Sequence, residues 1–244
     1  MQHAFGSGSW WGVESGANPT AVKFGVLQDG SVDFASSIKS LFGGSKYAVA
    51  VGQGTTKISW KAKFAQLSGR VVNSLFFGGT KSVGSTLVAE AEAGSIPATP
   101  FAVTVANAAT WVTDLGVRFA LTGLPLTRVA AAPATGQYSV ALGVYTFAAA
   151  DTLLGVKIDY TYTSASLGEN IAIVNSPIGP AASFKSVFTQ TYGGLRQTLV
   201  LNACYSEKIG IASKMEDFMI PELDGQASTD AGDNVGTWSL GEKT

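Results

Sequence analysis

A change in hydrophobic period marks the stretch from Thr55 to Gly79, and it predicts a strand followed by a helix. Strict alternation places four apolar residues on one face, namely Ile58, Trp60, Ala62 and Phe64. A period of two is typical of a strand that is buried on one face only. After Ser68, a good N-cap residue, apolar residues recur at helical spacing as far as Gly78. We therefore expect a half-buried strand and then one short α-helix at about residues 69–77.

The remaining apolar runs are short and are separated by glycine- and proline-containing turns, which predicts further strands. Gln28-Asp29-Gly30 stands between apolar runs and predicts a hairpin turn, and residues 40–51 are expected to form a loop. Leu142-Gly143 and Gly193-Gly194 predict two more turns. Short strands at fairly regular spacing are typical of a β-sandwich or barrel.

Two breaks in this pattern predict a discontinuous domain organisation. Residues 90–100 resemble a linker, and the strand pattern of the first part resumes near residue 166. We expect one β domain at 1–97 and 167–244, interrupted by a small β-sandwich domain at 98–166. The first domain begins with a glycine-rich arm at 1–20.

The arm carries two adjacent tryptophans, Trp10 and Trp11. Large aromatic side chains in such a segment need a surface against which they can be buried. The sequence leaves two possibilities open: the arm packs on its own domain, or it packs on a neighbouring subunit.

Charge is unevenly distributed along a chain whose net charge is only −1. Residues 1–90 carry eight basic and four acidic residues, so this segment is about +4, whereas residues 205–244 carry three basic and eight acidic residues and are about −5. The two ends could pair inside one fold or meet between subunits. A chain near neutrality is not typical of a nucleic-acid binder.

Charged side chains gather at two places that could serve an interface. Lys57, Lys61 and Lys63 share one strand face, which could be solvated, meet an acidic partner or hold phosphates. The acidic candidates lie near the C-terminal end: Glu216, Asp217, Glu222 and Asp224. We interpret these acids as a solvated or interface surface and not as a catalytic pair, because no histidine or arginine stands near them in sequence.

The residues that usually carry catalysis or bind metals are scarce. His3 is the only histidine and Cys204 the only cysteine, so neither a catalytic triad nor a zinc site is expected. Asp230–Gly236 has the composition of a calcium loop but lacks glycine at its sixth position and an acid at its twelfth, so we expect a polar turn. We expect no enzyme activity, cofactor or metal. No signal sequence or membrane-spanning run is expected either.

Several segments resemble the major tail proteins, or tail tube proteins, of tailed bacteriophages. The outer segments that carry this resemblance are Val22–Phe34, Gly54–Gly78, Thr198–Asp224 and Asp230–Leu240. The middle of the chain resembles a small β module that is inserted in such phage proteins, over Leu115–Val129, Gly136–Asp151 and Val156–Thr163.

The resemblance implies a structural protein of the virion tail, present in the host cytoplasm during assembly. Six copies would form a ring, and each copy would lend about four strands to one barrel. Rings would stack into a tube through which DNA passes without specific binding. Expected partners are further copies and other tail proteins, such as the tape measure, terminator and distal tail proteins, and the inserted domain is expected to face outward.

Two expectations follow from this resemblance. A channel wall lined with lysines would bind the phosphates of DNA. We therefore expect that Lys57, Lys61 and Lys63 do not all line the channel. Deletion of residues 1–15 is expected to weaken assembly. The alternatives are another virion structural protein, such as a head decoration or tail-tip component, and, less in keeping with the sequence, a carbohydrate-binding β-sandwich.

Overall fold

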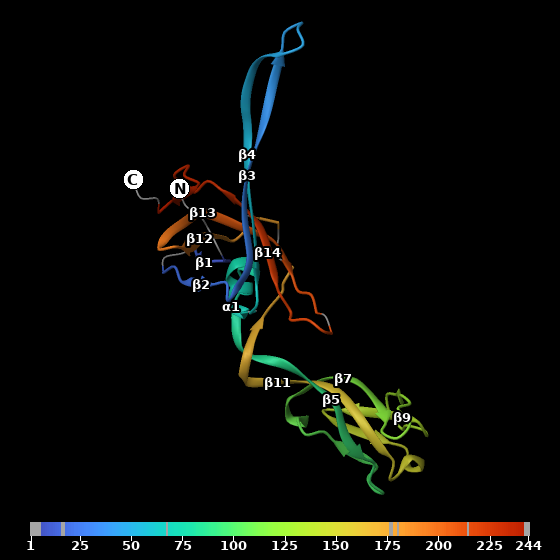
Figure 1. The fold of residues 1–244 in the computed structure, drawn as a ribbon. Coiled ribbons are helices and arrows are strands. Elements are labelled where there is room, and N and C mark those ends of the chain that lie inside the picture. Colours follow the sequence, from blue (N-terminus) through green and yellow to red (C-terminus); the bar gives the residue numbers. More distant parts are fainter. Residues whose placement is uncertain are drawn as a thin grey trace. The chain divides into compact units, whose positions relative to one another are not determined.

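A computed structural model describes residues 6–15, 18–66, 68–175, 178–179, 181–213 and 215–241. The chain divides into two compact units, of which unit 1 comprises Met1–Thr80 and Ile171–Thr244 and unit 2 comprises Lys81–Asn170 (Figure 1). Both units consist mainly of β-strands. Among the described residues there is one short helix, at residues 69–77, besides two 3-10 turns of three residues each. The predicted fold class is therefore confirmed. None of the described helices has the length and apolar character of a membrane span.

The boundaries of the inserted unit differ from the predicted 98–166. Strand β5 (Lys81–Ser95) was expected to belong to the first domain, but it pairs with β11 (Gly155–Ile171) in a sheet of unit 2. The proline-containing segment at 96–100 is therefore a connection within unit 2 and not a linker between domains. How unit 2 is placed in an assembly, and whether it faces outward, stays a prediction.

Unit 1 is built on one antiparallel sheet with the strand order β2-β1-β12-β13-β14-β4-β3, and β15 pairs with β13. Its strands are β1 (Ser9–Glu14), β2 (Ala21–Lys23), β3 (Leu27–Phe42), β4 (Ala48–Phe64), β12 (Ser183–Tyr192), β13 (Leu195–Gly210), β14 (Glu222–Ser228) and β15 (Gly236–Ser239). The predicted turn at Gly193-Gly194 is confirmed: it joins β12 to β13, and both glycines have positive φ.

Strands β3 and β4 form one long hairpin, so the predicted turn at Gln28-Asp29-Gly30 is wrong (Figure 1). These residues lie within β3, where a register shift between Leu27 and Asp29 accommodates one extra residue. Gly30 serves close packing instead of a turn, because a Cβ atom there would lie 3.0 Å from the Trp10 ring. The loop expected at 40–51 is likewise mostly strand, and only residues 43–47 connect β3 to β4.

The helix predicted at about 69–77 is confirmed in its extent. It begins as an α-helix, α1 (Gly69–Val72), and continues as a π-helical turn, η1 (Asn73–Phe77). Gly78 ends it in the left-handed region with φ of 62°. Val71 and Leu75 are buried in the core of unit 1, so the predicted apolar stripe is the face that packs.

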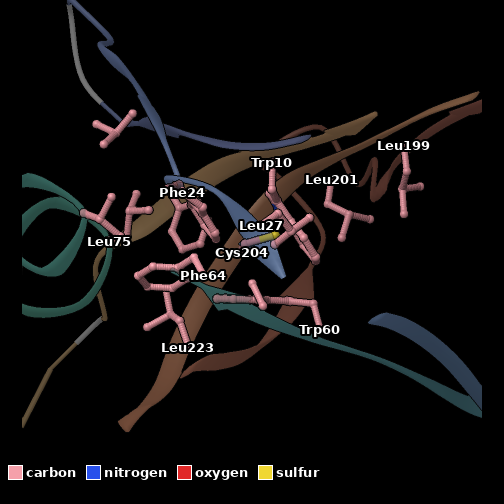
Figure 2. Close-up of a cluster of buried hydrophobic side chains, with 14 of the residues drawn as sticks. Trp10, Phe24, Leu27, Trp60, Phe64, Leu75, Leu199, Leu201, Cys204 and Leu223 are labelled. Carbon is pink, nitrogen blue, oxygen red and sulfur yellow. The ribbon is translucent and has the colours of Figure 1, made fainter. Parts of the chain in front are cut away.

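Five aromatic side chains lie in the core of unit 1, together with aliphatic side chains (Figure 2). Trp10 stacks on Phe24 with ring centroids 5.8 Å apart and also contacts Trp60 and Phe188. The alternation predicted for β4 is confirmed, because Trp60, Ala62 and Phe64 are buried and the intervening lysines are not. Strands β1, β4, β12 and β13 thus close on one apolar cluster.

Unit 2 is a small sandwich of two sheets. One sheet has the order β6-β10-β9-β8 and the other β5-β11-β7. The remaining bounds are β6 (Ala102–Thr104), β7 (Trp111–Phe119), β8 (Thr127–Arg128), β9 (Gln137–Ala141) and β10 (Val144–Phe147), with 3-10 turns at Ala108–Thr110 and Ala149–Asp151. Tyr145 from one sheet and Ile158 from the other share a core. The predicted turn at Leu142-Gly143 is confirmed between β9 and β10.

Candidate self-assembly surface

A row of alternating charges crosses four neighbouring strands on the face of unit 1 that turns away from the core. We call it the charge ladder, and its members are Asp29 on β3, Lys61 and Lys63 on β4, Glu222 and Asp224 on β14, and Lys208 on β13. The strand register aligns them, because Lys63 pairs with both Asp29 and Glu222, and Asp224 pairs with both Lys61 and Lys208. The sign of charge therefore alternates from strand to strand.

One contact in the charge ladder is short, and the others are long, including the central contact of Lys63 with Glu222 at 3.8 Å. Lys61 Nζ lies 2.6 Å from Glu222 Oε1. Lys63 Nζ lies 3.9 Å from Asp29 Oδ2, and Lys208 Nζ lies 3.7 Å from Glu222 and 3.9 Å from Asp224. The terminal side chains are also the most exposed, at 67% for Asp29 and 65% for Lys208, against 22% for Glu222.

Electrostatics of the central pair follow from this geometry. The hydrogen bond from Lys61 holds the pKa of Glu222 below its ordinary value of 4.5, and nearby lysines add to the effect. The same hydrogen bond raises the pKa of Lys61 above its ordinary 10.5. Both groups are thus charged over the whole neutral range.

Charges cancel among the charge ladder and its two nearest charged neighbours on the same face. Lys57 and Asp33 share this face with the charge ladder, because Asp33 pairs with Ser59, two residues from Lys57 and two from Lys61. The charge ladder together with Lys57 and Asp33 thus comprises four lysines and four acids. Lys57, Lys61 and Lys63 do share one face, as the sequence predicted.

The structure brings together some of the sequence-predicted interface residues and separates others. Lys61, Lys63, Glu222 and Asp224 meet in the charge ladder, so for these residues the basic and acidic ends of the chain pair inside one fold. Lys57 is exposed on the same strand. Glu216 and Asp217 lie apart from the ladder, exposed in the segment 211–221 between β13 and β14.

The N-terminal arm packs on its own domain at Trp10. This side chain is 1% exposed, and its indole Nε1 donates a 2.6 Å hydrogen bond to Ser186 Oγ. Trp11 is half-buried, with Lys23 Nζ 5.5 Å from its ring centroid. Trp10 is thus a core residue of unit 1, and the truncation of residues 1–15 would remove core as well as arm.

The part of the β3–β4 hairpin nearest its turn is a two-stranded ribbon. Strand β14 pairs with β4 only at residues 58–63, so beyond Ile58 no strand among the described residues pairs with the hairpin as a third strand. Its far part, residues 38–51, which we call the hairpin tip, exposes large apolar side chains: Ile38, Leu41, Phe42, Tyr47, Val49 and Val51, each at least 63% exposed. The sequence did not reveal this feature, because residues 40–51 were expected to form a loop.

A second exposed apolar segment lies at the opposite end of β4. Residues 211–221, which we call the β13–β14 loop, expose Ile211, Met215 and Phe218. This loop leads into Glu222, which pairs with Lys63 near the end of β4, whereas the hairpin tip begins at the other end of that strand. A strand of this length spans about 50 Å.

Unit 2 contains a buried polar cluster that the sequence analysis did not single out. Asp114 is almost fully buried and accepts hydrogen bonds from Tyr138 Oη at 2.7 Å and Tyr145 Oη at 3.1 Å. Burial and the neighbouring carboxylate raise the pKa of both phenols. Arg128 lies 3.7 Å from the carboxylate. These satisfied contacts fix the sandwich, and no sequence motif marks them.

The remaining candidate chemistry has structural explanations within the described residues. His3 lies outside them. Cys204 is buried, and burial raises the pKa of its thiol to about 12. Asp230 accepts backbone hydrogen bonds from Gly232 and Asn234, so the segment is a polar turn. No group of three or more potential metal-ligating side chains occurs in the part of the chain that the structure describes.

Comparison with protein-family models and with curated protein sequences gave no match.

Proposed function

We propose that this chain is a structural subunit of a phage tail tube, assembled from rings of identical copies through which DNA passes. The observation that carries the proposal is the sheet formed by β3, β4, β14 and β13. Its outermost strand, β3, is 16 residues long and has no strand partner on its outer side among the described residues.

An unpaired edge of this length needs a partner. Exposed, long and apolar edges template pairing with other chains, and isolated two-stranded ribbons are only marginally stable in water. A closed ring of identical copies can pair the edge of β3 over the part that lies in the barrel, because a closed barrel has no edge strands. With six copies, as the resemblance implies, four strands each give about 24 strands, more than the 16–18 that already leave an aqueous channel.

Stacking of rings would use the two exposed apolar segments. The hairpin tip and the β13–β14 loop lie at opposite ends of β4, so a tip from one ring can reach the loop side of the next. A head-to-tail contact needs two different complementary surfaces and generates an open filament. Exposed apolar side chains at both ends of one strand support this arrangement.

The outer face of the four strands is the surface that we assign to the channel, since the opposite face packs on the core. The four acids and four lysines of the charge ladder, Lys57 and Asp33 balance one another, so this part of the wall would not collect phosphates. This assignment replaces the expectation that not all of Lys57, Lys61 and Lys63 would line the channel. That expectation assumed that a wall lined with lysines would bind phosphates. Acids that pair with the lysines would prevent such binding.

The proposed setting is the virion tail, with contacts to other tail proteins at the ends of the tube. Immunogold labelling tests the proposal on native phage particles that contain this chain, with an antibody raised against the purified protein. Gold at regular intervals along the tail is the expected result. Gold on the head shell would favour a decoration protein, and gold confined to the distal end would favour a tip component; either pattern would refute the proposal.

A further inference from the structure

Charges at the two ends of the charge ladder are opposite in sign and incompletely paired. Asp29 at the β3 end and Lys208 at the β13 end are the most exposed members, and each reaches its partners only at 3.7 to 3.9 Å. In addition, Asp224 Oδ1, next to Lys208 in the register, is shielded from solvent and has no hydrogen-bond partner among the described residues. The terminal charges, Asp29 and Lys208, therefore have only long contacts, and among the described residues these lie on one side of each.

The β13 end of the charge ladder also has a free backbone edge. Strand β12 pairs with β13 only as far as Tyr205, opposite Ser183 where β12 begins. The Ser206 hydroxyl donates to Leu75 of the helix, so the helix accounts for that position. Beyond it, residues 207–210 have β14 on one side and no described strand on the other.

Strand direction fits a junction between β3 and β13 of two copies. Each step from β3 to β4, β14 and β13 is antiparallel, so β3 and β13 of one copy run in opposite directions. If a second copy is related by rotation about a ring axis, its β3 lies antiparallel to β13 of the first. The sheet then continues around the ring without a change of pattern.

We infer that, in the ring required by the proposed function, the outer edge of β3 in one copy pairs with residues 207–210 of β13 in the next, with Asp29 facing Lys208 across the junction. The order of signs across one copy is minus, plus, minus, plus, and the next copy begins again with minus. Opposite charges on adjacent strands stabilise the pairing, and like charges disfavour it. The charge ladder thus selects one register at the junction.

The competing junction would join the two ends of the whole sheet, β3 and β2. Strand β2 is only three residues long, and its Lys23 lies 5.5 Å from the Trp11 ring centroid. Its three residues are fewer than the four at the free edge of β13, and its lysine already contacts an aromatic ring within its own copy. The two junctions place different residues side by side, so chemical cross-linking distinguishes them.

Zero-length cross-linking of assembled wild-type protein tests the junction directly. Tubes grown from an equal mixture of ordinary and ¹⁵N-labelled chains are treated with a carbodiimide, which joins a carboxylate and an amine in contact as an amide. The 2.6 Å pair of Lys61 and Glu222 serves as an internal control within one copy. A cross-link between Asp29 and Lys208 that includes mixed-isotope species is expected.

Disulfide formation gives a second, independent measurement. Within one copy Asp29 and Lys208 are three strand spacings apart, about 14 Å, too far for a disulfide, and the native Cys204 is buried. Under mild oxidation, tubes of D29C/K208C are expected to give a series of covalent oligomers up to the ring. Tubes of the control variant D29C/K23C are expected to stay monomeric on a denaturing gel.

Each result bears on the junction separately from the proposed function. Tubes that cross-link through Lys23, or that give no mixed-isotope link at Lys208, would overturn the junction while leaving the tube intact. Gold labelling away from the tail would instead overturn the proposed function itself.

Discussion

Replacement of Trp10 by alanine would separate a core role of the N-terminal arm from a role between subunits. Trp10 is 1% exposed, lies within 6.0 Å of three aromatic ring centroids, and donates its indole hydrogen bond to Ser186. Burial of about 200 Å² at about 25 cal/mol per Å² is worth about 5 kcal/mol. Measured losses for truncation of a buried tryptophan are about 3–5 kcal/mol, so we expect a loss in this range for Trp10→Ala.

The single cysteine offers an assay that is specific to unit 1. Cys204 lies in the same core, and its thiol reacts with a maleimide only when that core opens. Pulsed labelling along a urea gradient would therefore follow the unfolding of unit 1 alone. With a denaturant slope of about 2 kcal/mol per molar, the expected midpoint falls by about 1.5–2.5 M.

Trp11→Ala is the matched control, because Trp11 is the neighbouring residue of the same strand but is only half-buried. Its loss, including the cation–π contact with Lys23, is expected to cost about 1 kcal/mol. If Trp10→Ala instead unfolds at the wild-type urea concentration and fails only in assembly, the arm acts between subunits and the reasoning from burial is refuted.

Three further perturbations probe other parts of the chain. Lysines at Leu41 and Val49 of the exposed hairpin tip should change the unfolding free energy by less than about 0.5 kcal/mol each, yet abolish tubes seen by electron microscopy; a double-lysine protein that still forms tubes would exclude a role for the tip. Tyr138→Phe removes the 2.7 Å hydrogen bond to buried Asp114 and should cost unit 2 about 1–3 kcal/mol in thermal denaturation; an unchanged melting temperature would contradict this. The pKa of Glu222 lies below 4.5 in the fold, so its contribution is complete above pH 4.5 and is lost as the pH falls through the lowered value. The stability difference between wild type and Glu222→Gln should therefore shrink on acidification below pH 4.5, and a constant difference would show that the lysine contact does not stabilise the fold.

Local rules predicted those elements whose side-chain pattern is set by burial. The alternation on β4 and the helix at 69–77 were readable because one face of each packs on the core. The pair Gly193-Gly194 likewise marked a turn in the sequence, and both glycines adopt positive φ in the structure. In these cases local preference and tertiary packing agree.

The failures occurred where a residue serves a distant contact. Gly30 was interpreted as part of a turn, but it makes room for Trp10, which is 20 residues away in sequence. The hairpin tip has no buried face within one chain, so its apolar residues gave no alternation to read. The pairing of β5 with β11, which sets the boundary of unit 2, is a long-range contact that no local pattern encodes.

The candidate site was predictable in its composition but not in its geometry. The sequence identified Lys61, Lys63, Glu222 and Asp224 as charged candidates, and the register of β4 with β14 shows that they pair within one chain. Asp29 and Lys208 were not singled out, because their importance lies in being the two ends of the charge ladder.

A helical reconstruction of the native tail by electron cryo-microscopy tests the proposed tube most directly. We expect a closed antiparallel barrel in which every copy contributes β3, β4, β14 and β13, with the charge ladder facing the channel and β3 of one copy beside β13 of the next. A tube whose channel is lined by other strands, or one with the charge ladder on its outer surface, would contradict this arrangement.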